Sequence, residues 1–259
     1  MLKKFSLLGA MLLSAATPAL AQDFAGSIDI NHTNITEDDA DLASTQFAVS
    51  GAIAISPQFA FGANVASYDV ETVDDAATNI TLHGMYRVTP TATIGLFASQ
   101  DTQGDFDNTA WGIETGVATR GAKFEAYYGW VDGLDGTSVR LDDFAIWGGS
   151  VAFRVARGFS LTAAIDAFSG SDDDYTETFS TATIGGLYDF GNGAAIYADI
   201  GSIGINGQDD EYLYDWGDAS YVGIGARFAF GADRGTVLGP RGVDQSFFPS
   251  SPTRDPLDF

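Results

Sequence analysis

The sequence predicts an all-β fold, an antiparallel transmembrane up-and-down β-barrel of about twelve strands, with ten to fourteen compatible with the pattern. Two observations carry this prediction. From residue 23 to residue 230, apolar residues alternate with small, polar or charged ones at a period of two. The acidic residues also gather in the longer of the two kinds of connection that join these alternating runs. A period of two gives each run one apolar and one polar face, which is typical of a strand between two different environments.

The composition excludes several classes of protein. The chain has 259 residues, a formal net charge of −23 and no cysteine, so it can form no disulfide, thiolate metal site or cysteine nucleophile. The negative charge repels phosphate backbones and argues against nucleic-acid binding. With 45% hydrophobic residues, the chain has enough apolar surface to escape disorder. Past the first twenty residues, no apolar run is long enough for a spanning helix.

The beginning of the chain has the order of a secretory signal peptide. Two lysines precede an apolar stretch over 5–16, and Ala19 and Ala21 place small residues before a predicted cut ahead of Gln22. A membrane anchor is the alternative, but the apolar stretch is too short to span a bilayer. We therefore expect a signal peptide over 1–21 and export into a periplasm. Losing both lysines changes the net charge from −23 to −25.

The barrel region, 22–230, alternates between strands and two kinds of connection. Clear alternating runs span 47–55, 59–65, 80–88, 124–130, 147–155 and 222–230. Short turns lie at 56–58, 89–91, 120–122, 156–158 and 191–193. Longer polar loops lie at 33–41, 69–76, 100–108, 132–143, 170–178 and 205–218. These five turns and six loops join twelve strands of about ten residues each. The first strand then begins, and the last strand ends, on the short-turn side of the barrel.

The charges are sorted by the length of the connection. The six loops hold 24 of the 35 acidic residues. Arginines near the short turns are Arg87, Arg120, Arg154, Arg157 and Arg227. A barrel that crosses a membrane has two different rims, with short periplasmic turns and longer outer loops. A soluble secreted sandwich or barrel also alternates, but it gives no reason for this sorting.

Aromatic residues at outward positions fall into two bands, as expected for a membrane protein with one girdle at each interface. The band on the loop side comprises Phe47, Trp111, Trp130 and Trp147. The band on the turn side comprises Phe59, Tyr86, Phe124, Phe153, Phe159, Tyr188, Phe228 and Phe230.

The final strand, 221–230, has apolar residues at alternate positions and ends in phenylalanine. Its characteristic residues are Tyr221, Val222, Ile224, Phe228 and Phe230. Together with the whole alternating region, this strand resembles those of Gram-negative outer-membrane β-barrels, and more loosely of porins of α-proteobacterial type. The resemblance implies an outer-membrane location among lipid and lipopolysaccharide. It also implies insertion by the barrel-assembly machinery, with these five residues as the assembly signal, although the chain continues for 29 residues beyond the last of them.

That extension, 231–259, contains four prolines and little alternation. Such a composition predicts an irregular periplasmic tail, disordered by default. A plug folded back into the lumen and a contact with another envelope component are the alternatives.

Inward positions of the predicted strands carry charges of both signs. The pore-lining candidates are His83, Arg87, Glu114, Glu125, Arg154, Asp166, Asp199 and Arg227. Charges inside a barrel must meet water or one another. They therefore line a hydrated channel or form arginine–carboxylate pairs that close it. Small residues at many other inward positions favour a narrow open passage, and hence a porin-like channel for passive diffusion of small hydrophilic solutes or ions.

Acidic triplets at 37–39, 172–174 and 209–211 offer hard oxygen ligands to loosely bound Ca²⁺ or Mg²⁺. Such ions would bridge a closed, structural barrel to lipopolysaccharide, which is the second hypothesis. None of the triplets matches a dedicated calcium loop, so we expect no cofactor, and a solvated acidic face is the default. The oligomeric state stays open.

The chain has only two histidines, and the pattern places His32 on the outward face and His83 on the inward face. Opposite faces exclude a shared catalytic centre, and no G-x-S-x-G motif is present. We therefore expect no catalytic residues and no enzyme. A barrel hydrolase using His32 is the third hypothesis.

Overall fold

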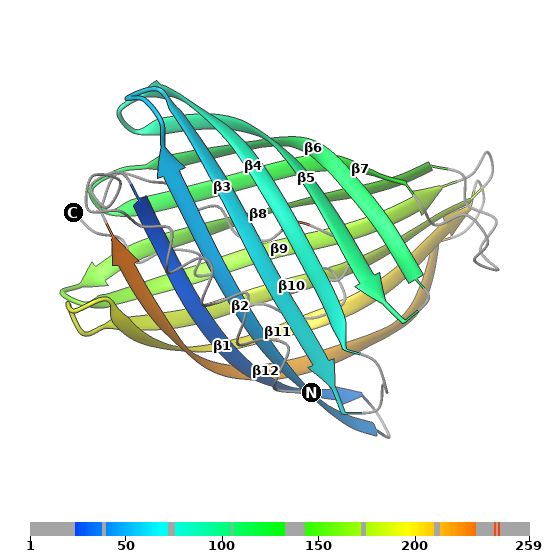
Figure 1. Cartoon of the computed structure of the whole chain (residues 1–259). Helices are drawn as coiled ribbons and strands as arrows, with labels where there is room; N and C mark the ends of the chain where they lie inside the picture. Colours follow the sequence, from blue (N-terminus) through cyan, green and yellow to red (C-terminus); the bar gives the residue numbers. More distant parts are fainter. Residues whose placement is uncertain are drawn as a thin grey trace.

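The computed structural model describes residues 24–37, 40–71, 76–104, 106–132, 143–171, 175–209, 213–231, 241 and 243. Across these ranges, twelve antiparallel strands form one closed barrel in which every strand pairs with its chain neighbours and β1 pairs with β12 (Figure 1). The strands are β1 (Phe24–Glu37), β2 (Ala40–Ala54), β3 (Phe59–Val70), β4 (Ala77–Thr89), β5 (Ala92–Gln103), β6 (Phe106–Ala118), β7 (Ala122–Asp132), β8 (Asp143–Ala156), β9 (Phe159–Ser171), β10 (Tyr175–Asp189), β11 (Ala194–Asp209) and β12 (Leu213–Gly231). The predicted closed barrel is confirmed.

The same ranges contain no helix that is long and apolar enough to cross a membrane.

The five predicted short turns are confirmed and gather at one end of the barrel, on the left in Figure 1. They connect β2 to β3, β4 to β5, β6 to β7, β8 to β9 and β10 to β11. The last turn requires glycine, because Gly191 and Gly193 have φ angles of 79° and 83°, which other residues rarely adopt. The remaining connections therefore lie at the opposite end.

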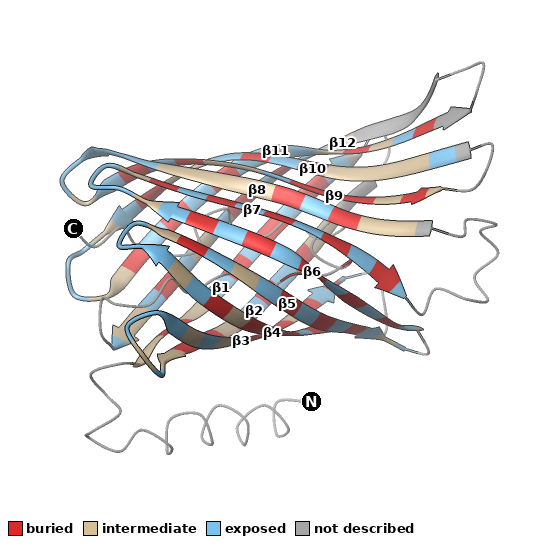
Figure 2. Cartoon of the chain, turned by 90° about the horizontal axis from the view of Figure 1, so that it is seen from above, coloured by how far each residue is buried: buried red, intermediate tan, exposed pale blue. Residues whose placement is uncertain are grey.

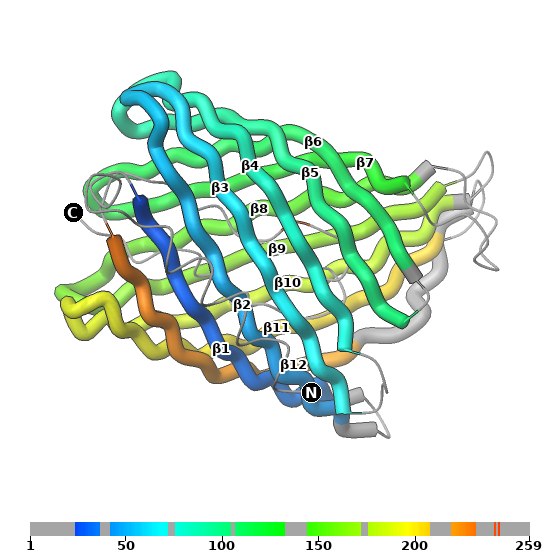
Figure 3. The backbone as a smooth tube through the Cα atoms, viewed as in Figure 1, coloured from blue at the N-terminus to red at the C-terminus, as the bar shows by residue number. Residues whose placement is uncertain are grey.

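The strands are longer than the sequence pattern indicates. They range from 11 residues in β7 to 19 in β12, and β1 and β2 continue through most of the loop expected at 33–41. Likewise, β11 ends at Asp209 and β12 begins at Leu213, within the loop expected at 205–218. Backbone pairing needs no apolar side chains, so polar hairpins continue the barrel wall beyond its apolar belt. Figure 3 shows the course of the backbone along these strands.

The outer face of the barrel is apolar and the inner face is polar, the reverse of a soluble protein. On β4, Leu82 is 59% exposed, whereas its neighbours Thr81 and His83 are 0% and 3% exposed. The same alternation of buried and exposed residues recurs along the strands (Figure 2). A soluble sandwich would bury its apolar series against a second sheet, so that alternative is wrong.

Exposed aromatic residues pair near both rims, at positions expected for the two girdles. The rings of Trp111 and Trp130, towards the long connections, are 4.8 Å apart. Those of Phe59 and Tyr86, beside a short turn, are 5.0 Å apart. Paired aromatic rings at two heights of an apolar outer face are typical of membrane interfaces.

Strands β1 and β12 close the barrel along the expected final strand. Asp29 lies directly opposite Arg227 in the register of this pair. The ring of Phe230 lies 5.9 Å from that of Phe24 and covers Gly26. Phe230 is therefore only partly exposed, because it packs across the closing seam.

Candidate functional site

The predicted pore-lining residues occupy the inner wall at different heights. Six have buried side chains: His83, Glu114, Glu125, Asp166, Asp199 and Arg227. The other two, Arg87 and Arg154, lie near the short turns, where Arg87 is half-buried and Arg154 is exposed. Six of the eight residues are therefore buried, including Arg227 close to the short-turn end, and two lie at a more exposed rim.

His83 lies at the centre of a hydrogen-bonded chain that joins β3, β4 and β6. The Asn64 amide Nδ2 lies 2.7 Å from His83 Nε2, and His83 Nδ1 lies 2.8 Å from Glu114 Oε1. Since an amide nitrogen can only donate, Nε2 accepts and Nδ1 carries the proton towards Glu114. Both ring nitrogens are thus engaged, and His83 orients its neighbours.

Other polar contacts bind the remaining strands together. Tyr127 on β7 donates to Asp166 Oδ1 on β9 at 2.8 Å. Arg227 Nε lies 2.5 Å from Asp29 Oδ1 across the closing seam. These bonds connect adjacent or nearly adjacent strands along the wall.

Glycines on the inner wall do not widen the lumen, contrary to the expectation from the small inward residues. A Cβ on Gly225 would lie 2.2 Å from Cζ of Tyr197, and one on Gly201 would lie 2.6 Å from the ring of Tyr221. Each tyrosine is the direct cross-strand partner of its glycine and is buried. The small residues therefore accommodate large rings from the neighbouring strand, and the interior is more closely packed than expected.

One residue of the C-terminal extension, Arg241, lies inside the barrel. Its side chain is fully buried, with Nε 3.2 Å from Glu114 Oε2 and Nη2 3.5 Å from Glu125 Oε2. The guanidinium carbon lies 4.5 Å from the ring centroid of Tyr127. A buried charge is stable only when it is paired, and here two carboxylates and an aromatic face surround it.

The backbone near Arg241 is also bound to the wall. Its N–H donates to Thr81 Oγ1 at 3.0 Å, and its carbonyl accepts from Asn79 Nδ2 at 2.7 Å. The N–H of Val243 donates to Asp101 Oδ2 at 2.8 Å.

The side chain of Val243 belongs to an apolar cluster of wall residues from five strands. The cluster comprises Phe97, Ala110, Tyr127, Val131, Ile146, Phe168 and Val243. Residues 241 and 243 thus differ from the expected periplasmic tail, because the wall provides partners for their charge, backbone and apolar side chain. The rest of the extension lies outside the described residues.

Arg241 was missed as a site residue because no periodicity marks it. The signal that points to it is an imbalance of charge on the inner wall. Buried carboxylates there are Asp101, Glu114, Glu125, Asp166 and Asp199, and the buried wall cations in the described strands are Lys123 and Arg227. This excess of five acids over two bases appears only in the assembled barrel, because the sequence pattern places Asp101 in a loop.

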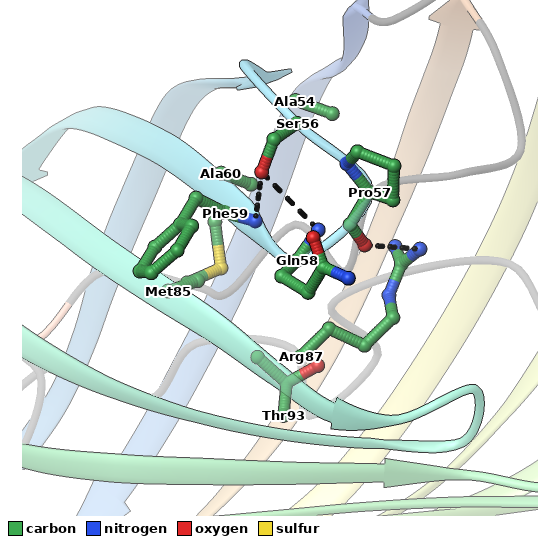
Figure 4. A pocket seen from close by; sticks show the side chains of 9 residues that line it. All are labelled: Ala54, Ser56, Pro57, Gln58, Phe59, Ala60, Met85, Arg87 and Thr93. Atoms are coloured by element: carbon green, nitrogen blue, oxygen red, sulfur yellow. Dashed lines mark hydrogen bonds between the residues drawn. The ribbon is translucent and has the colours of Figure 1, made fainter.

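A shallow hollow marks the rim beside the turn between β2 and β3 (Figure 4). Ser56 Oγ accepts from the N–H of Phe59 at 3.0 Å and so fixes the turn. Arg87 Nη1 lies 3.4 Å from the carbonyl oxygen of Pro57. The hollow thus places one of the predicted arginines, a fixed positive charge, at the short-turn mouth of the barrel.

The two histidines lie on opposite faces of the wall. His32 is exposed, and its Nδ1 lies 3.1 Å from Thr45 Oγ1 on β2. His83 is buried among the lumen contacts described above. β1 continues past His32 to Glu37, so this histidine lies within the strand.

Several expectations fall on parts of the chain that the structure does not describe. They include the signal peptide over 1–21 and, among the acidic triplets, residues 38, 39, 172–174, 210 and 211. Among the described residues, no three acidic or histidine side chains converge in a way that could hold a metal ion.

Comparisons with known proteins show a similarity of fold and no match in sequence. No protein-family model matches the chain, and none of the curated proteins matches it. The solved structure of the NanC porin is similar, with a TM-score of 0.60 and 14% identity over 78% of this chain and 98% of that chain. The KdgM porin in complex with disordered oligogalacturonate has a TM-score of 0.55 and 11% identity over 79% of this chain and 99% of that one. The fold is therefore that of an outer-membrane porin barrel.

Proposed function

We propose that the protein is a porin-like channel through which small hydrophilic solutes or ions diffuse passively across a Gram-negative outer membrane. One observation carries this proposal: the barrel is closed, with an apolar outer face and a polar, charged inner face. A closed barrel satisfies all its backbone hydrogen bonds within lipid, and its polar interior is compatible with water. The porin folds of the similar structures support the same function.

Radius and wall charge filter the solutes. Those that enter from the short-turn end first meet Arg87 and Arg154 at the rim, and then the buried wall around Glu114, Glu125 and Asp199. Fixed charges in a narrow, low-dielectric passage act strongly on permeating ions. Since carboxylates outnumber cations at mid-height, the wall favours cations there.

Export and assembly complete the proposal. The signal peptide over 1–21 directs the chain out of the cytoplasm, and the final strand, with Tyr221, Val222, Ile224, Phe228 and Phe230, is recognised by the barrel-assembly machinery. The resemblance of this strand also supports placing the chain among porins of α-proteobacterial type. We propose no enzymatic role and no cofactor, in keeping with histidines that lie on opposite faces of the wall.

A closed structural barrel is the second candidate, and the burial of the inner wall favours it. Thr81, Asn79 and Asp101 have almost no accessible surface, because Arg241 and Val243 contact them and fill this part of the lumen. In this case the function lies in the acidic outer loops, which would bind Ca²⁺ or Mg²⁺ loosely and bridge to lipopolysaccharide.

Conductance separates the two candidates. The full chain is refolded in detergent, its folding is checked by a heat-dependent shift on SDS gels, and it is added to a planar lipid bilayer. Discrete ohmic steps at low protein concentration support the channel. Absence of steps from folded, inserted protein contradicts it and favours the structural barrel. Calorimetry with Mg²⁺ then tests whether the outer loops bind divalent cations.

A further inference from the structure

We propose that the lumen contains a guanidinium-binding site, formed by Glu114, Glu125 and Tyr127, which the chain's own Arg241 occupies. Arg241 thereby obstructs the lumen at this level, and a free guanidinium compound that replaces Arg241 binds in the same place. This inference rests on the proposed channel function for its effect on permeation, but the site itself is tested separately below.

Wall residues contact both carboxylates that face Arg241. His83 Nδ1 holds Glu114 through Oε1 at 2.8 Å, which leaves Oε2 to face Arg241 at 3.2 Å. Lys123 Nζ pairs with Glu125 through Oε1 at 3.0 Å, which leaves Oε2 to face Arg241 at 3.5 Å. Each carboxylate therefore lies beside a wall residue through one oxygen, hydrogen-bonded at Glu114 and within ion-pair distance at Glu125, and beside Arg241 through the other.

The geometry suits a guanidinium group better than an ammonium group. The two carboxylates contact different nitrogens, Nε and Nη2, so they use the spread of donors on a planar cation. The ring of Tyr127, whose centroid is 4.5 Å from the guanidinium carbon, supplies an aromatic face. Lysine offers a point charge, which cannot match two separated acceptors and a ring as well.

Main-chain contacts show that the wall binds residues 241 and 243 as a peptide. Asn79 and Thr81 on β4 bind the carbonyl and N–H of Arg241, and Asp101 on β5 binds the N–H of Val243. These bonds span adjacent strands at the height where the wall side chains are fully buried. Arg241 and Val243 therefore lie inside the lumen, against β4 and β5.

The contacts are also of a kind that a solute can replace. The contacts of Arg241 and Val243 described above are hydrogen bonds, ion pairs and apolar packing. Removing Arg241 leaves five wall carboxylates with two wall cations among the buried residues of the described strands, an arrangement that favours another cation. The ligand class follows from this chemistry: guanidinium itself, or small compounds that carry the group.

The first test is the conductance of full-length variants in planar bilayers. We expect Arg241→Ala to raise the single-channel conductance at least threefold over the natural chain, because the buried side chain no longer fills the passage. Arg157→Ala, at an exposed turn, is the matched control and leaves the conductance unchanged. Arg241→Lys, which keeps the charge, is expected to fall between the two. The heat-dependent gel shift verifies that each variant folds.

The second test restores the missing group chemically. Guanidinium chloride at a few millimolar is expected to reduce the Arg241→Ala conductance at least twofold. Equimolar tetramethylammonium chloride should have no such effect, and adding Glu114→Gln to Arg241→Ala should abolish the response. Equal conductance of Arg241→Ala and the natural chain, together with no selective block, would overturn the inference while leaving the channel function intact.

A labelling experiment tests the site even if no variant conducts, an outcome that would contradict only the channel function. The chain has no cysteine, so Val243→Cys provides a single thiol in the lumen. We expect a charged maleimide to label this thiol at least tenfold faster when Arg241→Ala is also present. In the protein that keeps Arg241, labelling should stay slow even with millimolar guanidinium. Gln58→Cys, on an exposed turn, is the control and should label equally in both backgrounds. Equal rates at residue 243 would show that Arg241 does not hold the extension in place.

Discussion

Replacing Leu82 by arginine tests whether the apolar outer face lies in lipid. Leu82 is exposed and lies between the inward side chains of Thr81 and His83 on β4. A longer side chain at this position therefore points away from the lumen and disturbs none of the contacts described above. If the outer face is embedded in a bilayer, the charged group must enter the hydrocarbon layer.

The height of Leu82 sets the size of the effect. A strand rises about 3.3 Å per residue and is tilted by about 40° in such barrels, so it climbs about 2.5 Å per residue along the barrel axis. Tyr86, in the girdle on the turn side, is four residues away on the same strand, which places Leu82 about 10 Å above that girdle. The apolar band of such barrels is about 25 Å tall, so Leu82 lies close to its midplane, where arginine costs about 2–4 kcal/mol.

The assay is reversible unfolding of the full chain in lipid vesicles with a chemical denaturant. We expect Leu82→Arg to lower the free energy of unfolding by about 2–4 kcal/mol relative to Leu82→Ala, which corrects for the lost leucine. Thr109→Arg is the control near the outer rim, also on the exposed face, and should cost about 0–1 kcal/mol. Equal costs at the two positions, or no cost at Leu82, would refute a bilayer-spanning orientation of the outer face.

Three further predictions concern packing, membrane position and processing. Gly225→Ala should lower the free energy of unfolding by about 1–3 kcal/mol by forcing Tyr197 to move, whereas Gly84→Ala, whose Cβ would come no nearer than 3.9 Å to another residue, should be almost neutral in the same denaturation assay. The fluorescence of Trp111 and Trp130 should be quenched more by lipids brominated near the headgroup than by lipids brominated near the chain end. Stronger quenching by lipids brominated near the chain end would show that these tryptophans lie near the bilayer centre, which would contradict the girdle. Mass spectrometry of the exported protein should find it shorter by 21 residues, and an uncut chain would contradict the predicted signal peptide.

The barrel could be predicted from the sequence because its determinants are local. A period of two assigns each side chain to a face, and Pro, Asn and Gly mark the short turns, so neither feature requires knowledge of distant contacts. The length of the strands could not be predicted in the same way. Polar hairpins pair beyond the apolar belt through backbone hydrogen bonds, which leave no mark in the apolar pattern.

The inner wall was predictable only one strand at a time. Alternation places His83 and Glu114 inside, but whether they meet depends on the register across β4, β5 and β6. For the same reason, the small residue at position 225 favours an open lumen when the sequence is considered alone. In the structure, Tyr197 lies opposite Gly225 and its ring fills that space. Contacts between strands depend on the register with which the strands pair. A single sequence does not give this register, so these contacts could not be predicted from it.

Charge selectivity in this barrel depends on the extension as much as on the wall. With Arg241 in place, Glu114 and Glu125 each direct one oxygen to its guanidinium, and neither is open to a passing ion at this height. Without it, the same two carboxylates face the passage and attract cations. A count of wall charges therefore describes only the vacated channel. Since Arg241 is attached to the barrel by the chain itself, its local concentration in the lumen is high, and a solute must bind well or be abundant to displace it. Cation preference and closure are then two consequences of the same pair of carboxylates.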